Sequence, residues 1–598
     1  MFFLTCVAAT IDTRHFVYPS LSRSLLMEVG LLLGGLAICL RIMSGCVCGN
    51  RGNGTIGVHD DYRCRNFRLF ILVWIAYILI HGLLSPVMEW YRTTYLCVTL
   101  LSIIAFSYGL RCGILARRHI VDGLLMIAAA HVIAVFAQRL GILEPEDALY
   151  PVTGFNDNPN VTAMFLAGCV PFMVQRVADS DRRSAYVVFL VLLLVSILVL
   201  RCRTAYIGLA VEAAVMLLTL RQCVKLLRSY KWLSLTIAAA LISVSAVRMY
   251  HMKRDSADGR LLIWRLSAQM IWEHPLGQGY GLFEKHYNRC QAEYFATDGG
   301  TETERHTATY VGMAYNDYLE HGVDGGIIGL LFLAGFYVFV IRMSVRRKDR
   351  YATATLSALA VMSLANFVTA SIQPWLMAVS VASLSTGKDE YLHAKGKPPY
   401  EMPLRRVLPL LAITCAGAFP VVLMTLSQVE LKHLDDRIKT GERILDAEFA
   451  SLERCIYSSE AYWRTRFANN IRNGDHAAAM VSADKGLMLT SNPSLLLMQS
   501  SCLLQQMDTA KAVKTLEKVC HMQPSLLYPK LYLMRLHAAN GDTAMALRRA
   551  GEIISTQPKV DNEDARLIRR EAKAYIHRYM RQSPVETYIQ KTIKKRKK

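Results

Sequence analysis

Charged side chains are scarce in this sequence. Asp, Glu, Lys and Arg make up 19% of the 598 residues, whereas hydrophobic types make up 53%. A soluble enzyme of this length carries more surface charge, so the composition indicates a membrane protein. Apolar runs of roughly 18 to 23 residues, long enough to cross a bilayer, recur from about Leu25 to Ser427. The sequence after these runs is ordinary amphipathic sequence, so we expect a membrane part followed by a soluble part.

Metal-binding and signal-peptide patterns are also missing. The chain has 15 cysteines, but most of them lie inside apolar runs, and no paired CxxC or Cys/His spacing occurs. Such thiols behave as small hydrophobic side chains, so we expect no structural metal. Residues 1–20 lack a basic start and a clear small-residue cleavage site, so we expect no removable signal peptide.

The net charge of +21 does not by itself indicate a nucleic-acid partner. Most Lys and Arg residues stand in short clusters between the apolar runs, which is typical of cytoplasmic loops in membrane proteins. We therefore expect no nucleic acid as a partner. The basic end KTIKKRKK (591–598) is interpreted as a solvated tail or a phospholipid contact.

The apolar runs predict an all-α, polytopic bundle of about twelve membrane spans. The expected spans are 25–43, 67–86, 93–110, 118–140, 158–176, 184–201, 204–220, 231–248, 322–341, 352–371, 373–386 and 407–427, of which 373–386 is short. Lys and Arg gather in alternate loops, which we assign to the cytoplasm. This threading places the long loop 249–321 and everything after residue 428 on the outer side.

Short turns recur at a fixed period in the soluble part. Asp475, Asp508 and Asp542 lie 33 and 34 residues apart, and the prolines that end the units keep a similar spacing. A helix–turn–helix period of 34 residues is typical of tetratricopeptide repeats. Such a domain is either a structural cap or a platform for an acceptor or a partner protein.

These observations divide the chain into four parts. They are an N-terminal segment 1–24, a transmembrane domain 25–428 that includes the outer loop 249–321, a helical connector 429–461, and a repeat domain with a basic tail 462–598.

Two outward-facing segments contain polar residues for which an ordinary structural role is also possible. GFNDNPN (154–160) is an amide-rich turn that also serves as a helix start. RCRTA (201–205) brings two arginines to a junction of spans. A guanidinium at membrane depth needs an anionic partner, such as phosphate, or must extend to the interface.

The outer loop contains GRLLIWRLSAQMIWEHPLGQGYGLF (259–283). Its apolar residues follow a helical spacing, so we expect an amphipathic helix in the membrane interface with Trp264 and Trp272 as anchors. Arg260 and Arg265 would then lie near headgroup level. The GxGxG pattern at 277–281 has no preceding strand, so it is not a dinucleotide-binding motif.

AYNDYLEHGVDGG (314–326) places polar residues directly before an apolar run. Its glycines favour close helix packing, but packing does not explain Asn316, Asp317, Glu320 and His321. The order of these four segments resembles the O-antigen ligase and polymerase superfamily, and the resemblance covers about residues 150–345. The loop motif is the specific part of it.

The resemblance implies a glycosyltransferase at the periplasmic face of a bacterial inner membrane. Members transfer glycan from undecaprenyl diphosphate to lipid A core, to a growing polymer or to protein hydroxyls. Many ligases have His-Asn where this chain has Tyr315-Asn316, and Tyr is a poor base at neutral pH. His321, His306 or Glu320 could replace that histidine, and the sequence leaves the choice open.

Residues in these segments are candidates for individual roles. His321, Asn316 and Glu320 are the candidate catalytic residues, and Arg203, Arg260 and Arg265 are the candidate ligands of the donor diphosphate. No metal or other cofactor is expected, because the diphosphate is already a good leaving group.

A glycan ligase is therefore the leading functional hypothesis, with lipid A core or a protein hydroxyl as acceptor. A repeat-unit polymerase for O-antigen or capsule is the alternative enzyme. A polysaccharide transporter is disfavoured by the small number of ionisable residues in mid-helix. A membrane-anchored repeat scaffold would not need twelve spans.

Overall fold

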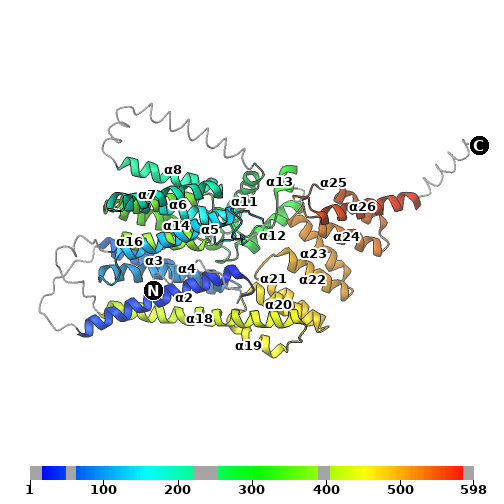
Figure 1. Ribbon diagram of the computed structural model, residues 1–598. Coiled ribbons are helices and arrows are strands. Elements are labelled where there is room, and N and C mark those ends of the chain that lie inside the picture. Colours follow the sequence, from blue (N-terminus) through cyan, green and yellow to red (C-terminus); the bar gives the residue numbers. More distant parts are fainter. Residues whose placement is uncertain are drawn as a thin grey trace, which may run out of the picture. The chain divides into compact units, whose positions relative to one another are not determined.

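The computed structural model describes residues 16–48, 62–146, 149–219, 254–297, 299–387, 404–559 and 561–582. Every regular element in these ranges is an α-helix (Figure 1), which confirms the all-α fold. The chain divides into two units. Unit 1 comprises Met1–Met249, Ile271–Gly281 and Met313–Tyr462, and unit 2 comprises Tyr250–Met270, Leu282–Gly312 and Trp463–Lys598.

Unit 1 contains the long apolar helices together with several shorter helices. They are α2 (Pro19–Cys48), α3 (Tyr62–Leu84), α4 (Trp90–Arg111), α5 (Arg117–Arg139), α6 (Pro159–Asp179), α7 (Arg183–Leu200), α8 (Arg203–Leu218), α14 (Asp317–Arg346), α15 (Arg350–Met362), α16 (Ile372–Thr386), α18 (Leu404–Thr440) and α19 (Asp446–Ile456). Helix α2 packs along α18, as Figure 1 shows, and α4 packs against α2 and α16. Fully buried aromatic rings, among them Trp74, Phe336 and Trp375, form the centre of this unit.

Eight helices of the described ranges are long and apolar enough to cross a membrane. They are α2 to α7, α14 and α18, and each overlaps one of the predicted spans. The predicted spans 204–220, 352–371 and 373–386 fall on the shorter helices α8, α15 and α16. The predicted span 231–248 lies outside the described residues. The polytopic helical membrane architecture is therefore confirmed, and the number of twelve spans stays a prediction.

Side-chain exposure on these helices fits a lipid environment. Helix α7 is apolar throughout, yet Val188, Val191 and Leu198 are exposed. In water such a surface would be unfavourable, whereas lipid tails cover it without cost. Some polar groups inside the bundle pair with each other: the Trp375 indole donates to Thr99 Oγ1 at 2.9 Å, and the Thr99 hydroxyl donates to the Tyr95 carbonyl at 2.7 Å.

Unit 2 combines the outer loop with the C-terminal helices. Its elements are α11 (Arg254–Glu273, up to Met270), α12 (Phe283–Ala296), α13 (Glu302–Thr307), α20 (Glu460–Arg472, from Trp463), α21 (His476–Leu487), α22 (Pro493–Gln505), α23 (Thr509–Met522), α24 (Leu527–Ala539), α25 (Thr543–Ser555) and α26 (Glu563–Gln582). The sequence-based division assigned the whole loop 249–321 to the membrane domain. In the structure most of that loop clusters with the C-terminal helices instead.

Specific contacts hold the loop helix α12 within unit 2. Helix α12 packs against α23. The Glu284 carboxylate accepts the hydroxyl of Thr490 at 2.7 Å and the backbone N–H of Ser491 at 3.1 Å. The Gln291 amide donates to the carbonyl of Met522 at 2.7 Å, and both partners are buried. These buried polar contacts fix the register of α12 on the C-terminal helices.

The periodic aspartates of the sequence are helix N-caps. The carboxylates of Asp475, Asp508 and Asp542 each accept the backbone N–H three residues later, at the starts of α21, α23 and α25. Consecutive helices from α21 to α26 also pack against one another. The period of 33 and 34 residues therefore reflects a repeated helix start, whereas the assignment to the tetratricopeptide class stays a prediction.

Helix α14 is broken in the middle. Gly325 and Gly326 leave the helical conformation, and Gly326 has φ of +66°. The segment 275–281 supplies the missing hydrogen bonds: Ile327 N–H donates to Pro275 O at 2.9 Å, and Gly279 N–H donates to Asp324 O at 2.9 Å. The glycines of HPLGQGYG and of DGG are therefore the two sides of one backbone contact.

We expect Gly326→Ala to destabilise unit 1. A Cβ atom at this position would lie 2.3 Å from Pro275 O, and the positive φ adds strain. The loss should be at least about 1–3 kcal/mol of unfolding free energy, measured on the purified protein in detergent. Gly417→Ala is the control, because its Cβ would meet Leu32 at 3.7 Å, an ordinary contact. Equal stability of the two variants would contradict the described break.

We expect Asp508→Ala to loosen the first turn of α23. Loss of the cap should cost about 1 kcal/mol, equivalent to roughly fivefold faster amide exchange in that turn. Hydrogen–deuterium exchange of peptides from α23 measures this directly. Asp508→Ser is the matched control, because Ser keeps the cap acceptor but not the ion pair with Lys511. Unchanged exchange in Asp508→Ala would show that the cap contributes nothing.

Candidate functional site

The first turn of α14 is fixed by its own side chains. The Asn316 carboxamide oxygen accepts the N–H groups of Tyr318 at 3.1 Å and Leu319 at 3.2 Å, so Asn316 is the N-cap. The preceding residue, Tyr315, has φ of +51°, a left-handed conformation that is unusual for a residue with a Cβ. Its ring stands edge-on to Phe367, with centroids 5.5 Å apart. This turn fixes the direction in which α14 starts and therefore the position of its polar side chains.

Asp317 ties α14 to the connection between α15 and α16. Its buried carboxylate accepts the backbone N–H groups of Val368 and Thr369, and the Thr369 hydroxyl at 2.7 Å. The N–H of Asp317 donates to Ser363 O at 2.8 Å. A buried carboxylate with this many donors is stabilised in place, so Asp317 has a structural role in unit 1.

Glu320 pairs with an arginine of another helix. One carboxylate oxygen of Glu320 lies 3.5 Å from Arg92 of α4, and the other accepts the N–H of Ala314 at 3.0 Å. Arg92 also donates to the carbonyl of Thr369 at 3.0 Å and to its hydroxyl at 3.2 Å. Thr369 therefore links the Arg92–Glu320 pair to the Asp317 contacts. The result is one buried polar network between α4, α14 and the α15–α16 connection.

His321 lies beside this network in an aromatic pocket. The side chain is 2% exposed and is flanked by Trp74, with ring centroids 6.0 Å apart, and by Tyr280, at 5.9 Å. Within the described residues neither ring nitrogen has a hydrogen-bond partner. Tyr280 belongs to the segment that docks on the break in α14, and its hydroxyl is the atom nearest to a Cβ built on Gly325. The segment 275–281 therefore places Tyr280 next to His321.

The amide-rich turn before α6 is a helix start. Asn158 caps α6 by accepting the N–H of Asn160 at 2.9 Å, and Asn156 donates to Thr162 at 2.8 Å. Gln138 of α5 accepts the backbone N–H of Gly154 at 2.8 Å. These contacts support the structural interpretation of this turn.

The three predicted phosphate-binding arginines are divided between the units. Arg203 is the first residue of α8 in unit 1, after Arg201, which has a left-handed φ of +49°. Arg260 and Arg265 lie on α11 in unit 2. The Arg265 guanidinium pairs with Glu304 at 2.8 Å, donates to the Tyr294 hydroxyl at 2.7 Å and is about half exposed.

The structure thus gathers Asn316, Glu320 and His321 at the start of α14, whereas the three arginines are not contained in one unit. Sequence reasoning missed Arg92, Trp74 and Tyr280 as neighbours of this cluster. Arg92 carried a usable signal, because a charged side chain within an apolar helix needs a partner. Trp74 and Tyr280 carried none, since aromatic residues are common in apolar helices and in loops.

Two comparisons with known proteins bear on this geometry. No curated protein matches the chain. The family model described as O-antigen ligase matches residues 172–334. The matched segment includes Arg203, the segment 275–281 before α12 and the cluster at the start of α14. It supports a glycan ligase or polymerase type of function and a membrane-embedded enzyme that uses a lipid-linked glycan. The segment 172–334 is therefore similar to the O-antigen ligase family, which supports the resemblance drawn from the sequence motifs.

Proposed function

We propose that this protein is a glycan ligase that transfers an oligosaccharide or polysaccharide from undecaprenyl diphosphate to an acceptor hydroxyl. The observation that carries this proposal is the polar cluster of Asn316 with the buried Glu320 and His321 at the end of an apolar helix, inside the matched segment 172–334. A lipid diphosphate has its tail in the bilayer and its phosphates at the interface. A site for it must therefore be polar and lie at a helix end.

In this reaction an acceptor oxygen attacks the anomeric carbon of the glycan, and the bond to the diphosphate breaks. A base removes the proton of the acceptor hydroxyl. We assign this role to His321, because its ring nitrogens are not engaged by other described residues. The Glu320 carboxylate is already engaged by Arg92 and by Ala314 N–H. We therefore assign Glu320 the role of positioning the side chains around it. Asn316 acts as a positioning residue, because it caps the turn that carries both side chains.

Arg203, Arg260 and Arg265 bind the donor diphosphate in this proposal. Charge builds up on the departing diphosphate, and guanidinium groups stabilise it through paired hydrogen bonds. Arg265 is held by Glu304 and stacks on the Tyr294 ring, 5.2 Å from its centroid, so its fork is oriented in advance. Because arginines neutralise the leaving group, the proposed reaction is independent of metal.

The charge bias of the loops supports a periplasmic site in the inner membrane, with the C-terminal domain on the same side. Lipid A core and protein hydroxyls are both suitable acceptors, and the repeat domain suits recruitment of an acceptor or of a periplasmic partner protein. A repeat-unit polymerase uses the same donor chemistry. The two enzymes differ in the acceptor, which for a polymerase is a second carrier-linked chain.

A reconstituted transfer assay tests the function. The full-length protein in nanodiscs should move glycan from undecaprenyl diphosphate to lipid A core or to an acceptor protein. His321→Asn should lower the rate per folded molecule by roughly 10²- to 10⁴-fold, the usual contribution of a general base. If glycan is transferred only to a second carrier-linked chain, the enzyme is a polymerase and not a ligase.

His131→Asn is the matched control for His321→Asn. His131 is also fully buried in unit 1 and also has one ring nitrogen without a described partner, but it lies beside Phe155 and Phe165. Removing it should affect protein yield more than turnover. If both variants lose activity in proportion to folded yield, His321 is structural and the assignment of the base is wrong.

Replacing Arg203, Arg260 or Arg265 by Ala should weaken donor use by about 10- to 150-fold, corresponding to ~1.5–3 kcal/mol for charge-assisted contacts. Lys should restore only part of the activity, because an ammonium lacks the bidentate fork. Donor affinity and transfer rate are measured for Ala and Lys variants at each position. An arginine whose side chain only extends to the membrane interface would tolerate replacement by Lys almost fully. Near-wild-type turnover in all three Ala variants would contradict the proposed phosphate site.

A further inference from the structure

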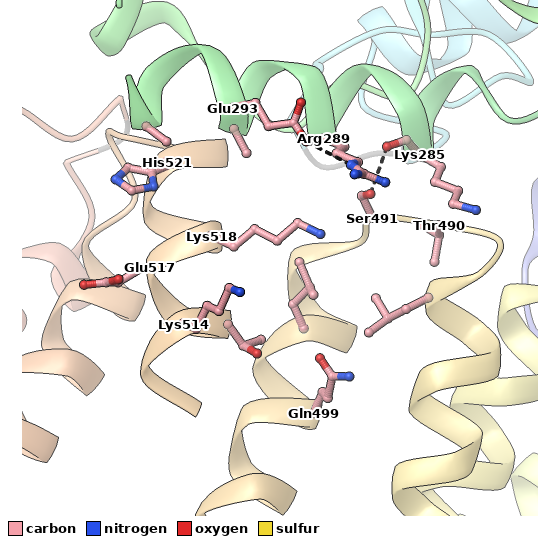
Figure 2. A pocket seen from close by; sticks show the side chains of 15 residues that line it. Lys285, Arg289, Glu293, Thr490, Ser491, Gln499, Lys514, Glu517, Lys518 and His521 are labelled. Carbon is pink, nitrogen blue, oxygen red and sulfur yellow. Dashed lines mark hydrogen bonds and ion pairs between the residues drawn. The ribbon is translucent and has the colours of Figure 1, made fainter. Parts of the chain in front are cut away.

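Unit 2 contains a cleft that the proposed chemistry does not use. Its volume is about 710 Å³, within the range of small-molecule sites. Helix α12 of the outer loop forms one wall, and the ends of α21 and α22 with one face of α23 form the other (Figure 2). Both walls belong to unit 2, and Glu284 joins them through Thr490 and Ser491.

Basic side chains converge on this cleft. Lys285 and Arg289 come from α12, and Lys514, Lys518 and His521 come from α23. Figure 2 shows Lys514 and Lys518 extending from α23 into the open space. Within the described residues neither of these two lysines forms an ion pair or a hydrogen bond.

The acidic residues of the cleft do not balance these charges. Glu293 is paired with Arg289 at 3.0 Å. Glu517 is engaged at 2.7 Å by Arg549, which is not among the lining residues, and it points away from the cleft in Figure 2. Lys285 donates to the carbonyl of Met488 at 2.6 Å, which is a neutral acceptor. The cleft therefore keeps an excess of positive charge.

Burial makes this excess unfavourable. Partial burial lowers the pKa of Lys285 and of Lys518 below the usual lysine range, and the nearby Arg289 lowers both further. Cations that are crowded in this way bind an anion with little reorganisation. The lining also includes apolar side chains, among them Leu487, Leu496 and Ala292. Such side chains pack against the C–H faces of a sugar ring.

We propose that this cleft binds a saccharide that carries a phosphate or carboxylate group. As part of the proposed function it would be a subsite for an anionic sugar of the acceptor or of the transferred glycan. Lysine ammonium groups suit this role, because they are point charges that accept an anion from several directions.

Binding to the full-length protein in phosphatidylcholine nanodiscs tests the site directly. The probes are glucose 6-phosphate and glucuronic acid, compared with glucose and inorganic phosphate, and the method is isothermal titration calorimetry. We expect both anionic sugars to bind more tightly than glucose or phosphate alone. Lys518→Ala should weaken their binding about tenfold, and the double variant Lys514→Ala/Lys518→Ala should weaken it further.

Lys511→Ala is the matched control. Lys511 lies on the same helix α23, is 74% exposed, pairs with Asp508 and does not line the cleft. Its replacement should change affinity less than twofold. Glucuronic acid binding should also weaken as the pH rises through the lowered lysine pKa, because the cations are lost while the carboxylate stays charged. Equal binding by the double variant and the wild type, or equal affinity for phosphate and glucose 6-phosphate, would overturn the site.

Transfer kinetics separate this inference from the proposed function. In the reconstituted assay, a raised KM for the acceptor in the double variant assigns the cleft to the acceptor, and a raised KM for the donor assigns it to the transferred glycan. Normal transfer kinetics without any probe binding would contradict the proposed saccharide site but not the proposed ligase function. Normal probe binding without any glycan transfer would instead overturn the ligase.

Discussion

The break in α14 is the constraint on which the site in unit 1 depends. A transmembrane helix that loses its regular conformation leaves backbone donors and acceptors without partners, which is costly inside a membrane protein. Here the segment 275–281 replaces the lost hydrogen bonds, through Pro275 O and the N–H groups of Gln278 and Gly279. The hydroxyl of Tyr77 adds a bond of 2.6 Å to Gly325 O. The outer loop is thereby joined to the membrane helix at the level of His321.

The same contact explains the glycines in both segments. A Cβ on Gly277 would lie 2.4 Å from Asp324 O, and a Cβ on Gly326 would lie 2.3 Å from Pro275 O. Two backbones approach so closely that neither side tolerates a side chain. The Asp324 carboxylate completes the contact by accepting the N–H of Gly281 at 2.9 Å. The glycines of the loop motif and the glycine pair inside α14 are therefore two sides of the same backbone contact.

Much of the fold could be predicted from the sequence, because local patterns determine it. The length of the apolar runs predicted the membrane helices, and the spacing of Asp475, Asp508 and Asp542 predicted the repeated helix starts. The break at Gly325 and Gly326 could not be predicted, since glycines in an apolar run fit close helix packing equally well. The pairing of Arg92 with Glu320 and of Glu284 with Thr490 joins residues more than 200 positions apart. Such contacts follow from tertiary packing and leave no local pattern.

The candidate site shows how charge is kept inside an apolar unit. Asp317 alone would be costly at this depth, but it binds the backbone of the α15–α16 connection, and Arg92 binds the Thr369 carbonyl of the same connection. Glu320 then neutralises Arg92, so each charged group is held by contacts that also fix another group. His321 differs from these residues, because its ring nitrogens have no partner in the described part of the chain. The proposed role of His321 in catalysis rests on this difference from the paired residues around it.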